Sequence, residues 1–229
     1  YRLDSPHSIQ QNHPLLLLRS SPHNGFFKYT SEPQPILLQH IRERDWYSVR
    51  FRLISHPRDA AYIDATSNQT TPLHAACLYR APHDIVVQLM EAWPVALWTQ
   101  DDEGWIPLHV HLLYSTTTTI ADETTTALIR AGGTSAAAIH LRIGGAALHL
   151  ACRHGTSSTV LRELLDICPN QVQIPSHSAG SYPANLLFRC NSRSSNGDLY
   201  ECLNLMIAAS HGRPVTRNDE RLLLLHDTS

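Results

Sequence analysis

The sequence contains no long apolar segment. Its longest leucine runs, at residues 15–18 and 222–225, span four residues each, whereas a helix needs about 20 apolar residues to cross a bilayer. The first residues also lack the basic start followed by an apolar stretch that marks a secretory signal. We therefore expect an intracellular, cytoplasmic protein without a membrane partner.

The sequence also lacks an excess of charge of either sign. The formal net charge is −2 and the isoelectric point is about 6.8. A general nucleic-acid binder would carry a clustered basic face, and a membrane-surface anchor would carry a polybasic segment. We expect neither kind of partner.

Motifs that bind metals, bind phosphates or supply a nucleophile are absent. There is no His-Glu-x-x-His, no Gly-Lys-Ser/Thr loop and no Gly-x-Ser-x-Gly. The five cysteines form no Cys-x-x-Cys pair, which argues against a zinc or redox site and favours reduced, buried thiols. His109 and His111 are two residues apart and do not share a helix face, and the spacing of five between His149 and His154 is poor for a shared ligand. We predict no catalytic residue, no metal and no cofactor.

What the sequence does contain is a repeated motif. Residues 71–77 read Thr-Pro-Leu-His-Ala-Ala-Cys, and weaker copies begin at residues 106 (Ile-Pro-Leu-His), 146 (Ala-Ala-Leu-His) and 182 (Tyr-Pro-Ala-Asn). The copies follow one another after 35, 40 and 36 residues. A fixed period of this length indicates an array of supersecondary units.

Each residue type in the motif has a physical role at the start of a helix. The hydroxyl of Thr71 can accept hydrogen bonds from the first free amides, and Pro72 loses nothing there because its missing amide has no intrahelical partner. The leucine faces the core, and the small residues after the histidine allow close helix packing. Because His74, His109 and His149 recur at one repeat position, we predict that they bridge backbone groups of successive repeats rather than act in catalysis.

A second register supports the same period. Pro57, Pro94 and Pro169 each follow an apolar helical pattern, with spacings of 37 and 75 residues. The motif marks where a first helix begins, and these prolines mark where a second helix ends. Two independent signals therefore agree on the same repeat period.

The two registers predict an all-α solenoid of about five helix-turn-helix repeats with short projecting turns. Gly104 is expected to take a positive φ in the turn 101–105, and Gly132-Gly133 to close a helix as a left-handed cap. We expect an irregular extension at 1–34, an array at 35–210 (35–66, 67–101, 102–141, 142–177 and 178–210) and a tail at 211–229. The predicted helix pairs are 35–41 with 45–54, 71–79 with 84–92, 107–114 with 123–131, 146–154 with 157–167, and 182–190 with 198–209.

On these motifs, residues of about 35 to 210 resemble the ankyrin-repeat family, in particular divergent arrays found in algal lineages. The first repeat lacks Leu-His, Ala147 replaces the proline of the fourth, and Asn185 replaces the histidine of the fifth. The resemblance implies stacked helix pairs, projecting turns and a concave face that binds another protein without catalysis. A regulatory ankyrin segment of a larger enzyme or signalling protein is the alternative.

The resemblance also implies which positions contact the partner. Turn-tip positions fall at Ser67, Asn68, Thr70, Ile143, Ser178 and Ser181, and inner-helix positions include Leu78 and Leu113. The strongest candidates combine these places with side chains typical of binding hot spots or with charge; they are Trp105, Asp102, Glu103, Tyr79, Tyr114, Arg142, Arg153, His154 and Arg189.

Two further expectations concern the state of the protein. We expect a monomer, and the sequence does not identify its partner protein. For Trp105, packing against the next turn is the alternative to a role in partner binding. Fifteen histidines also permit a pH-sensing hypothesis, because imidazole titrates near physiological pH.

Overall fold

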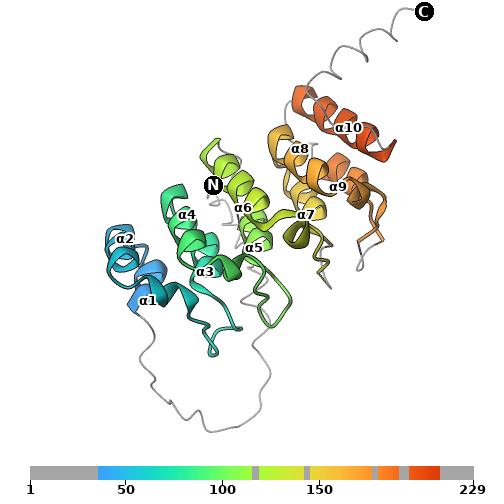
Figure 1. The fold of residues 1–229 in the computed structure, drawn as a ribbon. Coiled ribbons are helices and arrows are strands. Elements are labelled where there is room, and N and C mark those ends of the chain that lie inside the picture. The colour runs from blue at the N-terminus through green and yellow to red at the C-terminus, as the bar shows by residue number, and fades with distance from the viewer. Residues whose placement is uncertain (1–35, 115–118, 142–144, 177–179, 191–195, 212–229) are drawn as a thin grey trace, which may run out of the picture. The chain divides into compact units, whose positions relative to one another are not determined.

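The protein is described by a computed structural model over residues 36–114, 119–141, 145–176, 180–190 and 196–211. These residues form ten α-helices in sequential pairs (Figure 1) and no sheet, only two isolated β-bridges. The five predicted helix pairs are therefore confirmed, while the predicted extension at 1–34 and most of the predicted tail lie outside the described residues. The pairs are α1 (Ile36–Glu43) with α2 (Trp46–Ser55), α3 (Pro72–Leu78) with α4 (His83–Ala92), α5 (Pro107–Tyr114) with α6 (Thr119–Ala137), α7 (Ala147–His154) with α8 (Ser158–Ile167), and α9 (Pro183–Cys190) with α10 (Asn196–Ser210).

The helices form two rows. Odd-numbered helices contact one another in succession from α1 to α9, and even-numbered helices do the same from α2 to α10. We call the odd-numbered helices the inner helices and the even-numbered ones the outer helices. Each pair thus packs mainly on the pairs before and after it, which is the arrangement of a repeat array.

Local capping explains where the helices begin. Asp45 accepts a hydrogen bond from the Ser48 amide and caps α2, and Ser157 caps α8 in the same way through the Val160 amide. The Thr71 hydroxyl accepts from the His74 amide, with Pro72 in the first turn of α3. These are the groups that satisfy free amides at a helix start.

The prolines of the second register begin short 3₁₀ helices. These are η1 (Pro57–Ala61), η2 (Pro94–Leu97) and η3 (Pro169–Gln173), each directly after an outer helix. Helices α4 and α8 bury residues nine, eight, five and four positions before that proline: Ile85, Val86, Leu89 and Met90 in α4, and Val160, Leu161, Leu164 and Leu165 in α8.

The third repeat departs from this rule and corrects one prediction. In α6 the buried residues Thr124, Thr125, Leu128 and Ile129 place Gly133 where the other repeats have proline. Gly133 breaks the helix where the glycine pair predicts an end, but its φ of 60° and ψ of −159° are not those of the predicted left-handed cap, and a second helical segment, not predicted, follows directly and runs to Ala137. Ala136 and Ala137 then fill the core as Ala96 and Leu97 do after Pro94.

The core is mainly apolar, with a few buried polar side chains such as Thr124 and His149. Cys77 and Cys152 are buried at the same repeat position, as expected, and burial raises the pKa of the Cys77 thiol. Within the described ranges no disulfide joins the cysteines whose side chains are placed, and none of the helices there is both long and apolar enough to span a membrane.

Candidate partner-binding surface

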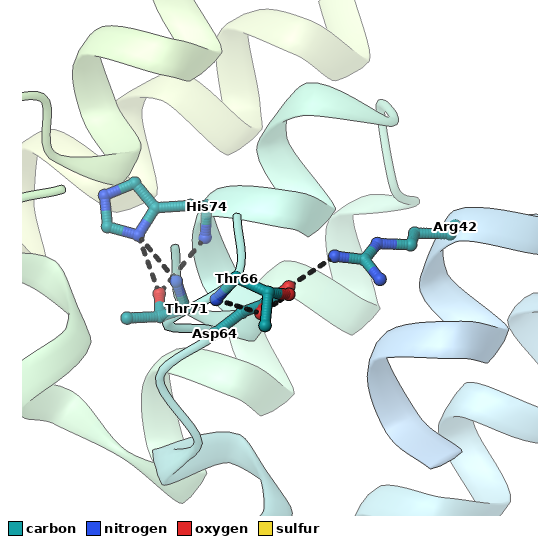
Figure 2. A network of polar contacts seen from close by, with 5 residues as sticks. All are labelled: Arg42, Asp64, Thr66, Thr71 and His74. Atoms are coloured by element: carbon teal, nitrogen blue, oxygen red, sulfur yellow. Dashed lines mark hydrogen bonds and ion pairs between the residues drawn. The ribbon is translucent and has the colours of Figure 1, made fainter. Parts of the chain in front are cut away.

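The turn before α3 is built around a buried carboxylate. Asp64 is fully buried, and its amide donates to the Thr70 carbonyl across the turn (2.9 Å). One carboxylate oxygen accepts from the Thr66 amide (3.0 Å) and hydroxyl (2.7 Å), and the other pairs with Arg42 of α1 at 2.6 Å (Figure 2). Burial by itself would raise the pKa of Asp64, but the Thr66 hydrogen bonds and the Arg42 charge outweigh it, so the pKa is lowered.

The next turn repeats the geometry without the arginine. Asp101 Oδ1 accepts from the amides of Glu103 (3.0 Å) and Trp105 (2.8 Å), and the Asp101 amide donates to the Trp105 carbonyl (2.9 Å). Gly104 has the expected positive φ of 83°. Burial raises the pKa of Asp101, and the nearby charges of Glu103 and Asp102 act in the same direction.

Histidines connect the inner helices to the turns. Nδ1 of His74 accepts from the Thr71 amide (3.2 Å), and its Nε2 lies 3.0 Å from the Trp105 carbonyl in the following turn (Figure 2 shows the Thr71 side). His149 does the same between the Ala146 amide (3.2 Å) and the Ile174 carbonyl (2.9 Å). Because an amide can only donate and a carbonyl can only accept, both rings are neutral and carry their proton on Nε2.

The third histidine completes only half of the arrangement. Nδ1 of His109 accepts from the Ile106 amide (3.4 Å), while among the described residues its Nε2 has no group in hydrogen-bonding geometry. Burial lowers the pKa of His74 to about 4, against the hydrogen bond to the Trp105 carbonyl. Burial also lowers the pKa of His109 to about 3; the Ile139 carbonyl opposes this shift, although it lies outside hydrogen-bonding geometry. The predicted bridging role is confirmed for His74 and His149.

Adjacent turn tips are joined to each other. The Asp102 amide donates to the Asn68 carbonyl (3.1 Å), and the Asn68 side-chain amide donates to Glu103 Oε1 (3.4 Å). The Asp102 side chain is exposed and that of Glu103 is half-buried. The two tips therefore form one continuous surface that presents carboxylates.

The two aromatic side chains at the third repeat are less accessible than expected. The Trp105 ring is half-buried and meets the His109 ring edge-on, with ring centroids 6.3 Å apart, so the alternative packing role has direct support. Tyr114 is only 9% exposed; burial and then the charge of Glu103 raise its pKa. Tyr114 has little surface to offer a partner, and we remove it from the candidate site.

The remaining candidates lie near the ends of the inner helices. Tyr79 and Arg153 are half-buried, and His154 and Arg189 are exposed. Arg142, Ile143 and Ser178 lie outside the described residues. Of the other turn positions, Ser67 is exposed, and Asn68, Thr70 and Ser181 are half-buried.

One residue in this row was missed from the sequence. Arg42 is the seventh residue of α1, and the seventh residues of the other inner helices are Leu78, Leu113, Arg153 and Arg189. Because the first repeat lacks Leu-His, the motif does not point to Arg42, although counting from the helix start would have found it. Its guanidinium forms an ion pair with Asp64.

An open depression of about 530 Å³ lies on the outer helices. It is lined mostly by polar residues, among them His83, Glu123 and Arg130. No group of three or more metal-ligating side chains occurs in the part of the chain that the structure describes.

The sequence matches no protein-family model, and no curated protein is significantly similar to it. The likeness to the ankyrin-repeat family therefore remains an inference from the motif residues.

Proposed function

We propose that the protein is a non-catalytic scaffold of the ankyrin-repeat type, which binds a partner protein along its turns and inner helices. The observation that carries the proposal is the His74 bridge, which ties the start of one repeat to the turn of the next. Such bridges hold exposed side chains on rigid elements, and rigid support is what a binding surface needs.

The chemistry of this surface changes along the array. The turn tip at Asp102 and Glu103 carries negative charge, and the ends of α7 and α9 carry Arg153 and Arg189. Charged groups of this kind select partners mainly through complementarity. We propose that the partner segment presents basic residues to the turn tips and acidic residues to α7 and α9.

We further propose that the protein works in the cytoplasm as a monomer. Cys77, Cys152 and Cys202 are buried thiols, which suits a reducing compartment. A regulatory role inside a larger enzyme or signalling protein would use the same surface.

The test is affinity capture from a cell lysate with the parent chain and two charge-reversal variants. Asp102→Lys changes the turn tip, and Asp166→Lys changes an equally exposed carboxylate on the outer helix α8. We expect one protein to be retained by the parent and by Asp166→Lys but lost by Asp102→Lys. Equal retention by all three chains would move binding away from the turns and reject the proposal.

A further inference from the structure

The carboxylate of Asp101 has one oxygen that no described residue contacts. Its Oδ1 accepts from the amides of Glu103 and Trp105, whereas within the described ranges its Oδ2 accepts no hydrogen bond and forms no ion pair. Asp101 is only 9% exposed, so most of its surface is held away from water. Burying a charge costs free energy unless an opposite charge or further hydrogen bonds compensate it.

The preceding turn shows such a compensation. Asp64 begins that turn as Asp101 begins the next: its amide donates to the residue before the helix cap, and its carboxylate accepts from the amide two positions later. Its second oxygen pairs with the guanidinium of Arg42 at 2.6 Å, and Asp64 is completely buried under this contact (Figure 2). One chain thus presents equivalent carboxylates twice, once with a guanidinium and once without.

The inner helix beside Asp101 supplies no such group. Arg42 is the seventh residue of α1, and the seventh residue of α3 is Leu78, which has no hydrogen-bond donor in its side chain. Arg80, two residues later, is exposed and forms no ion pair with Asp101. A cation for Asp101 therefore has to come from outside the described residues.

The surroundings of Asp101 favour a cation. Burial raises its pKa, and the charges of Asp102 and Glu103 act in the same direction. The pKa of Asp64, beside Arg42, is lowered instead. Oδ2 of Asp101 is also not among the atoms sealed from solvent without a partner in the described part of the chain, so a group from solution can reach it.

A guanidinium fits this place better than an ammonium. It is the more weakly hydrated of the two cations, so it loses less when it leaves water. Its several N–H donors lie in one plane, and one guanidinium can therefore contact two carboxylates at once. Glu103 offers a second carboxylate within the electrostatic reach of Asp101. The contact between Arg42 and Asp64 is the precedent inside this chain.

We propose that Oδ2 of Asp101 binds an arginine side chain of the partner protein, in the way that the Asp64 carboxylate binds Arg42. We call this oxygen and its surroundings the Asp101 site. The inference rests on the function proposed above, because it assumes a partner at the turns, and it specifies one residue that the partner presents there.

The probe for the Asp101 site is ethylguanidinium chloride, titrated into the ¹⁵N-labelled full chain at constant ionic strength. The amides of Glu103 and Trp105 report on binding, because both donate to Asp101. We expect saturable shifts of these two signals in the parent, and weaker binding of ethylammonium chloride. Asp101→Asn, which keeps an acceptor at Oδ1 but removes the charge, should bind ethylguanidinium about tenfold more weakly. Asp102→Asn removes an exposed neighbouring charge and is the matched control; it should bind within about twofold of the parent.

A second pair of variants fills the site from within the chain. Leu78→Arg places a guanidinium at the helix position that Arg42 occupies in α1, and it should abolish the shifts caused by ethylguanidinium. Leu78→Gln has a side chain of similar size without charge and should bind like the parent. Unchanged melting temperatures in the presence of the probe show that the chain stays folded during the titration.

Two results would overturn the inference. One is the absence of saturable shifts in the parent, or equal binding by Asp101→Asn. The other is binding that appears only in Arg80→Gln, which would assign the site to Arg80 of the chain itself. Lysate capture with Asp102→Lys separates this inference from the proposed function. Guanidinium binding together with equal capture by Asp102→Lys and the parent would keep the Asp101 site and reject the proposed function, whereas lost capture without guanidinium binding would reject the Asp101 site alone.

Discussion

The middle of the array exposes fewer large apolar side chains than its two ends do. Of the twelve large apolar side chains exposed in the described residues, five lie between Ile36 and Ile63, five lie between Ile174 and Ile207, and only Val95 and Trp98 lie between these groups. Trp98 also donates its indole N–H to the Gly132 carbonyl. A middle pair packs on pairs at both sides and buries its apolar groups against them, whereas among the described residues the first and last pairs have a neighbouring pair on one side only.

The junctions between repeats differ in the same way. The first pair has Leu38 where the second has His74, and it reaches the next turn through the Arg42–Asp64 ion pair instead of a neutral imidazole. The contact between successive repeats can therefore be made by an ion pair or by a histidine, and these two kinds of contact respond differently to pH and to mutation.

The largest expected effect is on the middle of the core. Leu148→Ala should lower the free energy of unfolding by roughly 2–5 kcal/mol, because it removes a side chain that is almost fully buried. Urea unfolding followed by circular dichroism measures this. Ile54→Ala, at an exposed side chain of α2, is the control and should change stability little; equal losses would show that Ile54 is buried in solution.

The next effect concerns the histidine junctions and pH. In the folded state the pKa of His74 is lowered to about 4 and that of His109 to about 3, so between these values and about 6.5 only the unfolded chain binds the protons. Stability is therefore complete above about pH 6.5 and falls as the pH decreases. From pH 7 to 5.5 the two groups together should cost roughly 2–3 kcal/mol.

Thermal unfolding at several pH values measures this dependence. His74→Asn, which copies the residue at position 185 of the fifth repeat, should remove about half of the slope. A melting temperature that stays flat between pH 5.5 and 7.5 would contradict the assignment of both histidines and end the pH-sensing hypothesis.

The ion-pair junction of the first repeat should be somewhat less costly to break. Asp64→Asn keeps the size of the side chain but removes the charge that Arg42 and Thr66 contact, and we expect a loss of about 2 kcal/mol. Asp102→Asn, at an exposed carboxylate, is the control. Calorimetry distinguishes them, and an unchanged midpoint for Asp64→Asn would mean that the Thr66 bonds alone hold the turn.

The smallest expected effect is at the helix cap. Thr71→Ala should cost about 1 kcal/mol, because the His74 amide loses its acceptor at the start of α3. Thr71→Ser should restore the stability, since serine offers the same hydroxyl. The fourth repeat has Ala146 at this place and keeps only the bond from its amide to His149.

Several features follow from the sequence because their causes lie within a few residues. The cap at Thr71, the prolines at helix exits and the positive φ of Gly104 each depend on one local turn, and the structure has them where the sequence predicts them. The continuation of α6 beyond Gly133 was missed, because a glycine that breaks a helix does not show whether the next turn resumes it.

Other features depended on groups far apart in the chain. Arg42 finds Asp64 22 residues later, and Tyr114 is buried by neighbouring elements that no local pattern identifies. The exposed face of α2 carries the same kinds of residue as a core face, so its spacing alone did not distinguish the two. Local hydrogen bonding and steric preference determine where each helix begins and ends, whereas the packing of whole helices decides which faces are buried and which remain free to bind.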